Sequence, residues 1–202
     1  MIFDLFSYVE QPEKTGSPEE DIRALYERNG RQKTWRHVSD VAVVNGEIAR
    51  QYGLDEGKCR LSALLHDIGA VIAPDDMLVF IESRGLALCE AERRHPFLLH
   101  QRVSRVIAEE YFSIEDPEIL LPIQHHTTLR EDATAYDMAL FIADKLAWDQ
   151  DGVPPFYDAV RTALDESLEA ACLKYMDYMI DSGKLLYPHT DWTKAHRWLK
   201  EK

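Results

Sequence analysis

Apolar residues recur along most of this chain at the spacing of an amphipathic α-helix. The clearest stripe repeats every three or four positions and consists of Val38, Val41, Ala42, Asn45, Ile48, Ala49 and Tyr52. We expect Thr34 to cap the start of this helix and Gly53 to end it. A second helix should begin after Asp55, whose carboxylate can accept a hydrogen bond from the first turn, and should end at Gly69.

Further helices are predicted by the same periodicity and by their start signals. Prolines at positions 18 and 74, each followed by acidic residues, are typical of a first helical turn. Strand-like alternation is nearly absent, which predicts an all-α fold with one domain at 18–202. A separate N-terminal segment, 1–17, should join it through a flexible link within 11–18. Later helices should cover about 97–112, 116–126, 134–149, 154–181 and 190–200, with a loop at 149–155.

Length, composition and charge restrict the class of protein. A chain of 202 residues, 46% of them apolar, can bury one substantial core. Its 23 basic and 36 acidic residues give a net charge of −13, so we expect neither nucleic acid nor membranes as partners. The three cysteines form no Cys-x-x-Cys pair, and no stretch has the pattern of a signal peptide or a membrane span. A cytoplasmic location is therefore expected.

The candidate chemistry lies in histidines and aspartates beside apolar runs. His66 and Asp67 follow two leucines, and a metal ion would explain such a pair because it binds neutral imidazole and carboxylate together. Asp144 ends an apolar run and would be costly to bury without a cation. The other candidate ligands are His37, His100 and His126. Each residue taken singly also fits a packed or capping histidine or a solvated aspartate.

The order His37, His66–Asp67, Asp144 resembles the defining motif of the HD-domain superfamily of metal-dependent phosphohydrolases. His100 and His126 resemble the additional ligands of the branch that holds two metals. Within the superfamily the chain is most similar to the YqeK-type symmetrical diadenosine tetraphosphate hydrolases of bacteria, from about residue 35 to about 190. This resemblance implies a helical bundle with a dinuclear centre, often of iron, with manganese, cobalt or magnesium as alternatives.

The resemblance also implies a role for each ligand. Asp67 would bridge the two metals, and water acidified at the centre would attack a phosphorus. The substrate implied is diadenosine tetraphosphate, cut in the middle of its phosphate chain to give two ADP. His37, His66 and Asp144 would complete one metal site, and His100 and His126 the other.

Two departures from the family pattern leave the substrate open. Many members have a lysine where this chain has Ala70, and the segment 145–149 replaces one that commonly contains Glu-Pro and a nearby arginine. Lys145 and Arg130 are candidate replacement cations in catalysis, although each also fits a solvated side chain. The alternatives are a mononucleotide phosphohydrolase and a nucleotide-sensing metal module without catalysis. Apolar positions in the long C-terminal helix also allow a homodimer.

Overall fold

The computed structural model describes residues 2–148, 150, 152–185 and 187–202. Within these ranges it contains eleven α-helices, three 3-10 helices and no strand, which confirms the all-α prediction. The 3-10 helices are η1 (Ile2–Leu5), η2 (Ile68–Val71) and η3 (Pro96–Leu99). The α-helices are α1 (Pro18–Arg28), α2 (Gln32–Tyr52), α3 (Glu56–Leu65), α4 (Pro74–Ser83), α5 (Glu90–Arg94), α6 (His100–Glu110), α7 (Pro117–His125), α8 (Ala135–Leu146), α9 (Tyr157–Glu166), α10 (Leu168–Asp181) and α11 (Thr190–Lys200).

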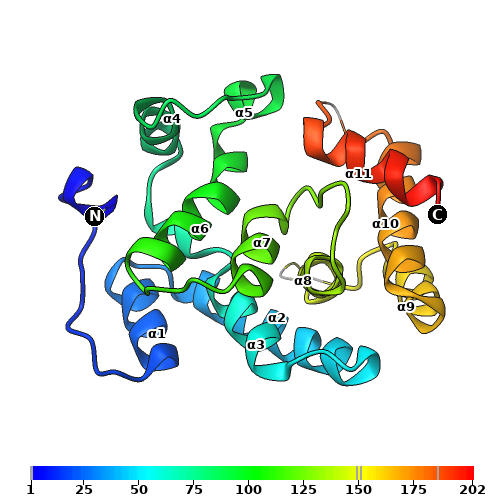
Figure 1. Ribbon diagram of the computed structural model, residues 1–202, viewed down its shortest axis with the longest axis horizontal. Helices are drawn as coiled ribbons and strands as arrows, with labels where there is room; N and C mark the ends of the chain where they lie inside the picture. Colours follow the sequence, from blue (N-terminus) through cyan, green and yellow to red (C-terminus); the bar gives the residue numbers. More distant parts are fainter. Residues whose placement is uncertain (1, 149, 151, 186) are drawn as a thin grey trace.

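Helix α8 lies at the centre of the molecule and is viewed nearly along its axis in Figure 1. Its residues from Met138 to Ala143 are all buried, as expected of a helix that is apolar on every side. Helices α2, α3, α7 and α10 pack around it. This arrangement places the C-terminal turn of α8, which carries Asp144, among the ends of its neighbours.

The N-terminal segment shares the core of the rest of the chain. The Phe3 ring packs edge-on against Tyr111 with centroids 5.1 Å apart, and the Lys14 ammonium lies 4.3 Å from the centre of the same ring. The backbone N–H of Thr15 donates to Asp21 at 2.6 Å. Residues of the predicted flexible link therefore make defined contacts, and the domain boundary at 17/18 stays a prediction. The buried apolar side chains here are Ile2, Phe3, Phe6 and Val9.

Two predicted helix ends agree with the structure and several others differ. Gly53 ends α2 in the left-handed conformation (φ 69°) and Asp55 caps α3, as predicted. However, α2 begins at Gln32, so Thr34 lies inside the helix rather than at its cap. The predicted helix at 154–181 is two helices, because Ser167 adopts extended backbone and its hydroxyl accepts a hydrogen bond from the first turn of α10. The predicted helix at 134–149 includes residue 149, and the predicted loop at 149–155 includes residues 149 and 151. These two residues lie outside the described residues.

The two ends of the chain lie on opposite sides of the molecule (Figure 1). Helix α11 packs against α10, and its Trp192 is buried near the rings of Phe141 and Tyr175. The three cysteines are free thiols. Among the described helices, none has both the length and the apolar character that crossing a membrane requires.

Candidate metal centre

The six predicted ligand side chains lie next to one another around the C-terminal turn of α8. The four imidazoles form a row in the contact order His37, His66, His126, His100, with successive ring centroids 5.5, 4.6 and 4.8 Å apart. We call these four side chains the imidazole row. They come from α2, from the turn after α3, from the turn after α7 and from the start of α6. His66, His100 and His126 are buried.

The two aspartates lie along this row. Asp67 presents its two carboxylate oxygens to different rings: Oδ1 lies 3.2 Å from His100 Nε2 and 3.4 Å from His126 Nε2, and Oδ2 lies 3.6 Å from His66 Nε2. Asp144 Oδ1 lies 3.0 Å from His37 Nε2 and 3.5 Å from His66 Nε2. Two groups of side chains that could hold a metal thus share Asp67. The first group is His37, His66 and Asp67, and the second is Asp67, His100 and His126.

Backbone carbonyls fix the orientation of three of the imidazoles. In His66, His100 and His126, Nδ1 lies 2.7, 2.6 and 2.9 Å from the carbonyl oxygen of the residue three positions earlier. A carbonyl only accepts, so in the neutral ring Nδ1 carries the proton and Nε2 keeps its lone pair. Metal-binding histidines usually have such a partner on their second nitrogen.

The freed Nε2 atoms make a donor set that fits divalent metal ions. His100 Nε2 and His126 Nε2 lie 2.9 Å apart, and neither has a proton to share in this tautomer. His66 Nε2 is buried and accepts no hydrogen bond among the described residues. Lone pairs facing one another and carboxylate oxygens are unfavourable unless a cation lies between them. These described side chains are therefore better suited to binding metal ions than to contacting one another directly.

Burial and neighbouring charges prepare these groups for a cation. Burial lowers the pKa of His126 to about 4 although Asp67 opposes it, so this imidazole is neutral at pH 7. Burial would raise the pKa of Asp67, but the neighbouring imidazoles, first of all His66 in its protonated form, hold it well below its ordinary value. Burial would likewise raise the pKa of Asp144, which Lys145 and the neighbouring imidazoles hold low. Both carboxylates are therefore anionic at neutral pH.

A glycine brings Asp67 close to α6. The Gly69 N–H donates to Ser104 Oγ at 2.8 Å, and a Cβ at Gly69 would lie 2.5 Å from the His100 carbonyl oxygen. Only a residue without a side chain allows this approach of η2 to the start of α6. Gly69 does not end the preceding helix as predicted, because α3 already ends at Leu65 and Gly69 lies within η2.

The two predicted cations lie in different surroundings. Lys145 forms an ion pair with Asp144, and its ammonium donates to the His126 carbonyl oxygen at 3.3 Å, so it belongs to the centre. Arg130 instead pairs with Asp137 at 2.7 Å, at the start of α8. No interaction between Arg130 and the six ligands is seen in the described part of the chain. Catalytic roles for Lys145 and Arg130 stay predictions.

A cavity of about 200 Å³ adjoins the His37 end of the imidazole row. Two of its aromatic residues, Phe156 and Tyr175, were assigned in the sequence only to the apolar stripe of a helix, because helical spacing cannot distinguish a packed ring from one that lines a cavity. The full lining consists of His37, Asp144, Lys145, Trp148, Phe156 and Tyr175.

A second cluster, formed by Cys89, Glu92 and His189, fits a metal poorly. His189 Nδ1 accepts a hydrogen bond from the Asp191 N–H at 3.1 Å, so in the neutral ring the proton is on Nε2. This Nε2 lies 3.5 Å from Glu92, and Arg102 already supplies that carboxylate with a positive charge at 2.9 Å. The cluster differs from the imidazole row in offering no free imidazole lone pair.

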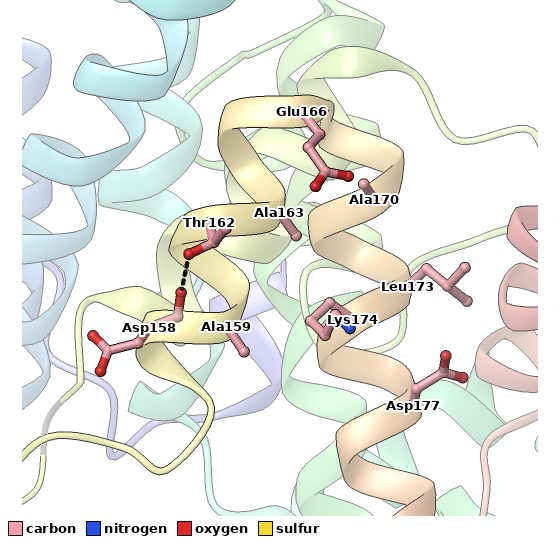
Figure 2. Close-up of a pocket in the computed structure, with 9 residues that line it drawn as sticks. All are labelled: Asp158, Ala159, Thr162, Ala163, Glu166, Ala170, Leu173, Lys174 and Asp177. Atoms are coloured by element: carbon pink, nitrogen blue, oxygen red, sulfur yellow. Dashed lines mark hydrogen bonds between the residues drawn. The ribbon is translucent and has the colours of Figure 1, made fainter.

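A larger groove, of about 560 Å³, lies between α9 and α10 (Figure 2). Within α9, on one side of the groove, the Thr162 hydroxyl donates to the Asp158 carbonyl oxygen one turn earlier, at 2.9 Å. Its charged lining consists of three carboxylates and one ammonium, from Asp158, Glu166, Asp177 and Lys174. None of the six candidate ligands lines this groove, and its excess of carboxylates gives it little attraction for a phosphate.

Comparisons with known proteins agree with this geometry. The HD domain family matches residues 34–149, the span that contains all six candidate ligands. An uncharacterized protein in the pepC 5' region of Lactococcus lactis subsp. cremoris is 36% identical over 148 residues, covering 73% of this chain and 72% of that protein. A symmetrical bis(5'-nucleosyl)-tetraphosphatase of Bacillus subtilis is 24% identical, covering 81% of this chain and 89% of that enzyme.

The fold has a match among solved structures. A crystal structure from Clostridium acetobutylicum, of a protein described as a predicted HD superfamily hydrolase involved in NAD metabolism, superposes with a TM-score of 0.80 at 25% identity. The match covers 90% of this chain and 96% of that one. Fold, ligand order and sequence similarity lead to one conclusion: this chain belongs to the HD-domain superfamily of phosphohydrolases.

Proposed function

We propose that this protein hydrolyses diadenosine tetraphosphate symmetrically, to two molecules of ADP, at a centre of two divalent metal ions. The observation that carries the proposal is Asp67, whose two oxygens face different imidazoles of the row. A carboxylate in this position can bridge two metals. The similarity to a symmetrical bis(5'-nucleosyl)-tetraphosphatase supports the choice of substrate.

In this proposal His37, His66 and Asp144 hold one ion, and His100 and His126 hold the other, with Asp67 common to both. Two such ions would supply an acidified water and positive charge for the phosphate oxygens. Iron is our proposed metal, although imidazole and carboxylate ligands also suit manganese and cobalt. The chain itself contributes imidazoles held by backbone carbonyls, which therefore need little reorientation to bind.

We assign Lys145 the task of attracting phosphate to this acidic molecule. The net charge of −13 repels a polyanionic substrate, so a local cation is needed at the site. The Lys145 ammonium lies beside Asp144 and lines the adjoining cavity. Because the cysteines are free thiols, we place the enzyme in the reducing cytoplasm.

The test is a product analysis. The protein is loaded anaerobically with ferrous iron and incubated with diadenosine tetraphosphate, and the nucleotides are separated by anion-exchange chromatography. ADP as the sole product supports the proposal, whereas AMP together with ATP contradicts symmetrical cleavage.

The same assay separates the two alternatives. Turnover of mononucleotides but not of the dinucleotide would identify a mononucleotide phosphohydrolase, which the departures at Ala70 and Lys145 leave open. Tight nucleotide binding without phosphate release, under iron, manganese, cobalt or magnesium, would identify a sensing module.

A further inference from the structure

We propose that Phe97 and Trp148 are stacking platforms for two nucleobases, one at each end of the imidazole row. This inference rests on the proposed function, because diadenosine tetraphosphate carries one base at each end of its phosphate chain. It adds the groups that would recognise those bases.

Phe97 lies flat on the His100 end of the row. Its ring stacks on that of His100 with centroids 4.6 Å apart and an interplanar angle of 17°, yet 52% of the residue is exposed. The backbone carbonyl of Phe97 also accepts the hydrogen bond from His100 Nδ1. The Phe97 ring is thereby held in place relative to His100, a candidate metal ligand. Much of the surface of Phe97 stays open to a nucleobase.

Trp148 lies at the opposite end. It lines the 200 Å³ cavity together with His37 and Asp144, and 36% of the residue is exposed. Its ring packs edge-on against Phe156 at 5.9 Å and 84°, and Phe156 in turn packs edge-on against Tyr175 at 5.0 Å. These rings support the indole from within and leave it partly open to the site.

The order of contacts matches the chemistry of the proposed substrate. From one end to the other the site presents an aromatic ring, the imidazole row with its two aspartates, and a second aromatic ring. A base on Phe97 and a base on Trp148 would leave the phosphates over the row, where the Lys145 ammonium also lies. Every base has a flat π-face, so stacking of this kind discriminates little between adenine and guanine.

The test compares ring removal with ring retention. The variants are Phe97→Ala and Trp148→Ala, with Phe97→Tyr and Trp148→Phe as partners that keep a ring. Val79→Ala, at an exposed position of α4, is the control. For each protein KM and kcat are measured with diadenosine tetraphosphate and with inorganic tetraphosphate, which has no base.

Each alanine variant should raise KM for diadenosine tetraphosphate roughly tenfold, within the ~5- to 150-fold range of lost base stacking. In each alanine variant KM for inorganic tetraphosphate should rise by much less than KM for diadenosine tetraphosphate, and the ring-retaining variants should lose little with either substrate. An unchanged KM in both alanine variants overturns the proposal. So does an equal loss with inorganic tetraphosphate, because that would show damage to the centre rather than loss of stacking.

Binding of ADP tests the platforms without turnover. By equilibrium dialysis the metal-loaded protein should bind two ADP per chain. Each single alanine variant should bind one of the two roughly tenfold more weakly and the double variant both, with circular dichroism confirming the fold. If the unmodified protein fails to cleave diadenosine tetraphosphate, the proposed function fails while these ADP affinities still decide the platforms. If it cleaves the substrate and ADP binding is the same in all variants, the platforms fail while the function stands.

Discussion

At the scale of single residues, His37 differs from the other three imidazoles of the row. Its Nδ1 is buried without a hydrogen-bond partner among the described residues, and its Nε2 faces Asp144 at 3.0 Å. No carbonyl therefore fixes its tautomer, unlike those of His66, His100 and His126. We expect the His37 half of the centre to bind its metal more weakly than the other half.

Two substitutions should separate the halves. His37→Ala should leave one metal ion per chain, because Asp67, His100 and His126 remain in place. Asp67→Ala should leave none and abolish turnover, because both halves share this carboxylate. Elemental analysis after dialysis gives the stoichiometry, with His196→Ala as the control, since that imidazole pairs with Asp177 outside the centre. Two retained ions in Asp67→Ala would refute the bridging role.

The six ligand side chains could be found in the sequence because their order is itself a motif. The carbonyls that orient three of them could not, since every residue has a carbonyl and only the fold decides which one faces a ring. The positions of Phe97 and Tyr175 beside the site could not be predicted either. An aromatic residue in an apolar stripe has the same sequence spacing whether it packs in the core or lines a cavity.

At the scale of elements, the contact between η2 and α6 depends on Gly69. A methyl group there would overlap the His100 carbonyl and the Ser104 side chain, so Gly69→Ala should destabilise the fold by roughly 1–3 kcal/mol and weaken metal retention. The matched control is Gly46→Ala within α2, where the nearest atom is an Arg50 nitrogen at 3.8 Å. That change should stabilise the protein by roughly 0.5–1 kcal/mol. Urea unfolding measures both, and equal effects of the two changes would contradict the close-approach argument.

The break between α9 and α10 shows what local sequence patterns cannot reveal. The apolar stripe continues through Ser167 without interruption, so periodicity alone predicts one helix. The carbonyl of Leu164, near the end of α9, instead accepts hydrogen bonds from Gln51 and Tyr52 of α2. These partners are more than a hundred positions away in the sequence. By contrast, α11 covers the predicted range 190–200, because its start and end signals are local.

At the scale of the whole molecule, Glu92 of α5 connects its own helix with α6 and with the distant segment before α11. It accepts hydrogen bonds from the Cys89 N–H at 2.8 Å and from Arg102 of α6 at 2.9 Å, and His189 before α11 lies 3.5 Å away. Burial would raise the pKa of Glu92, but these partners, led by His189, lower it to about 2. The carboxylate therefore stabilises the folded state more than a protonated acid would.

This arrangement predicts a defined dependence of stability on pH. In the unfolded chain Glu92 titrates near 4.5, so at pH 3 the unfolded state binds more protons and stability rises with pH. The contribution, up to about 3 kcal/mol, is complete above pH 4.5 and is lost as the pH falls to about 2. Urea unfolding of Glu92→Gln should show this difference at pH 7 and a smaller one at pH 3. The control is Glu90→Gln, at an exposed ion pair with Arg94, which should change stability by less than about 0.5 kcal/mol at either pH. An effect of Glu92→Gln that does not depend on pH would contradict the prediction.

The imidazole row draws on elements that are far apart in the chain, and this has a consequence for biosynthesis. His37 and Asp144, whose side chains meet at 3.0 Å, are separated by 107 positions. While the ribosome is still making the chain, α2 can emerge and fold long before its partner carboxylate exists. The His37 half of the centre can close only after α8 has left the exit tunnel, so a truncated or stalled chain has no complete centre. In the proposed two-metal centre, the His37 half therefore takes up its ion later in synthesis than the half formed by Asp67, His100 and His126.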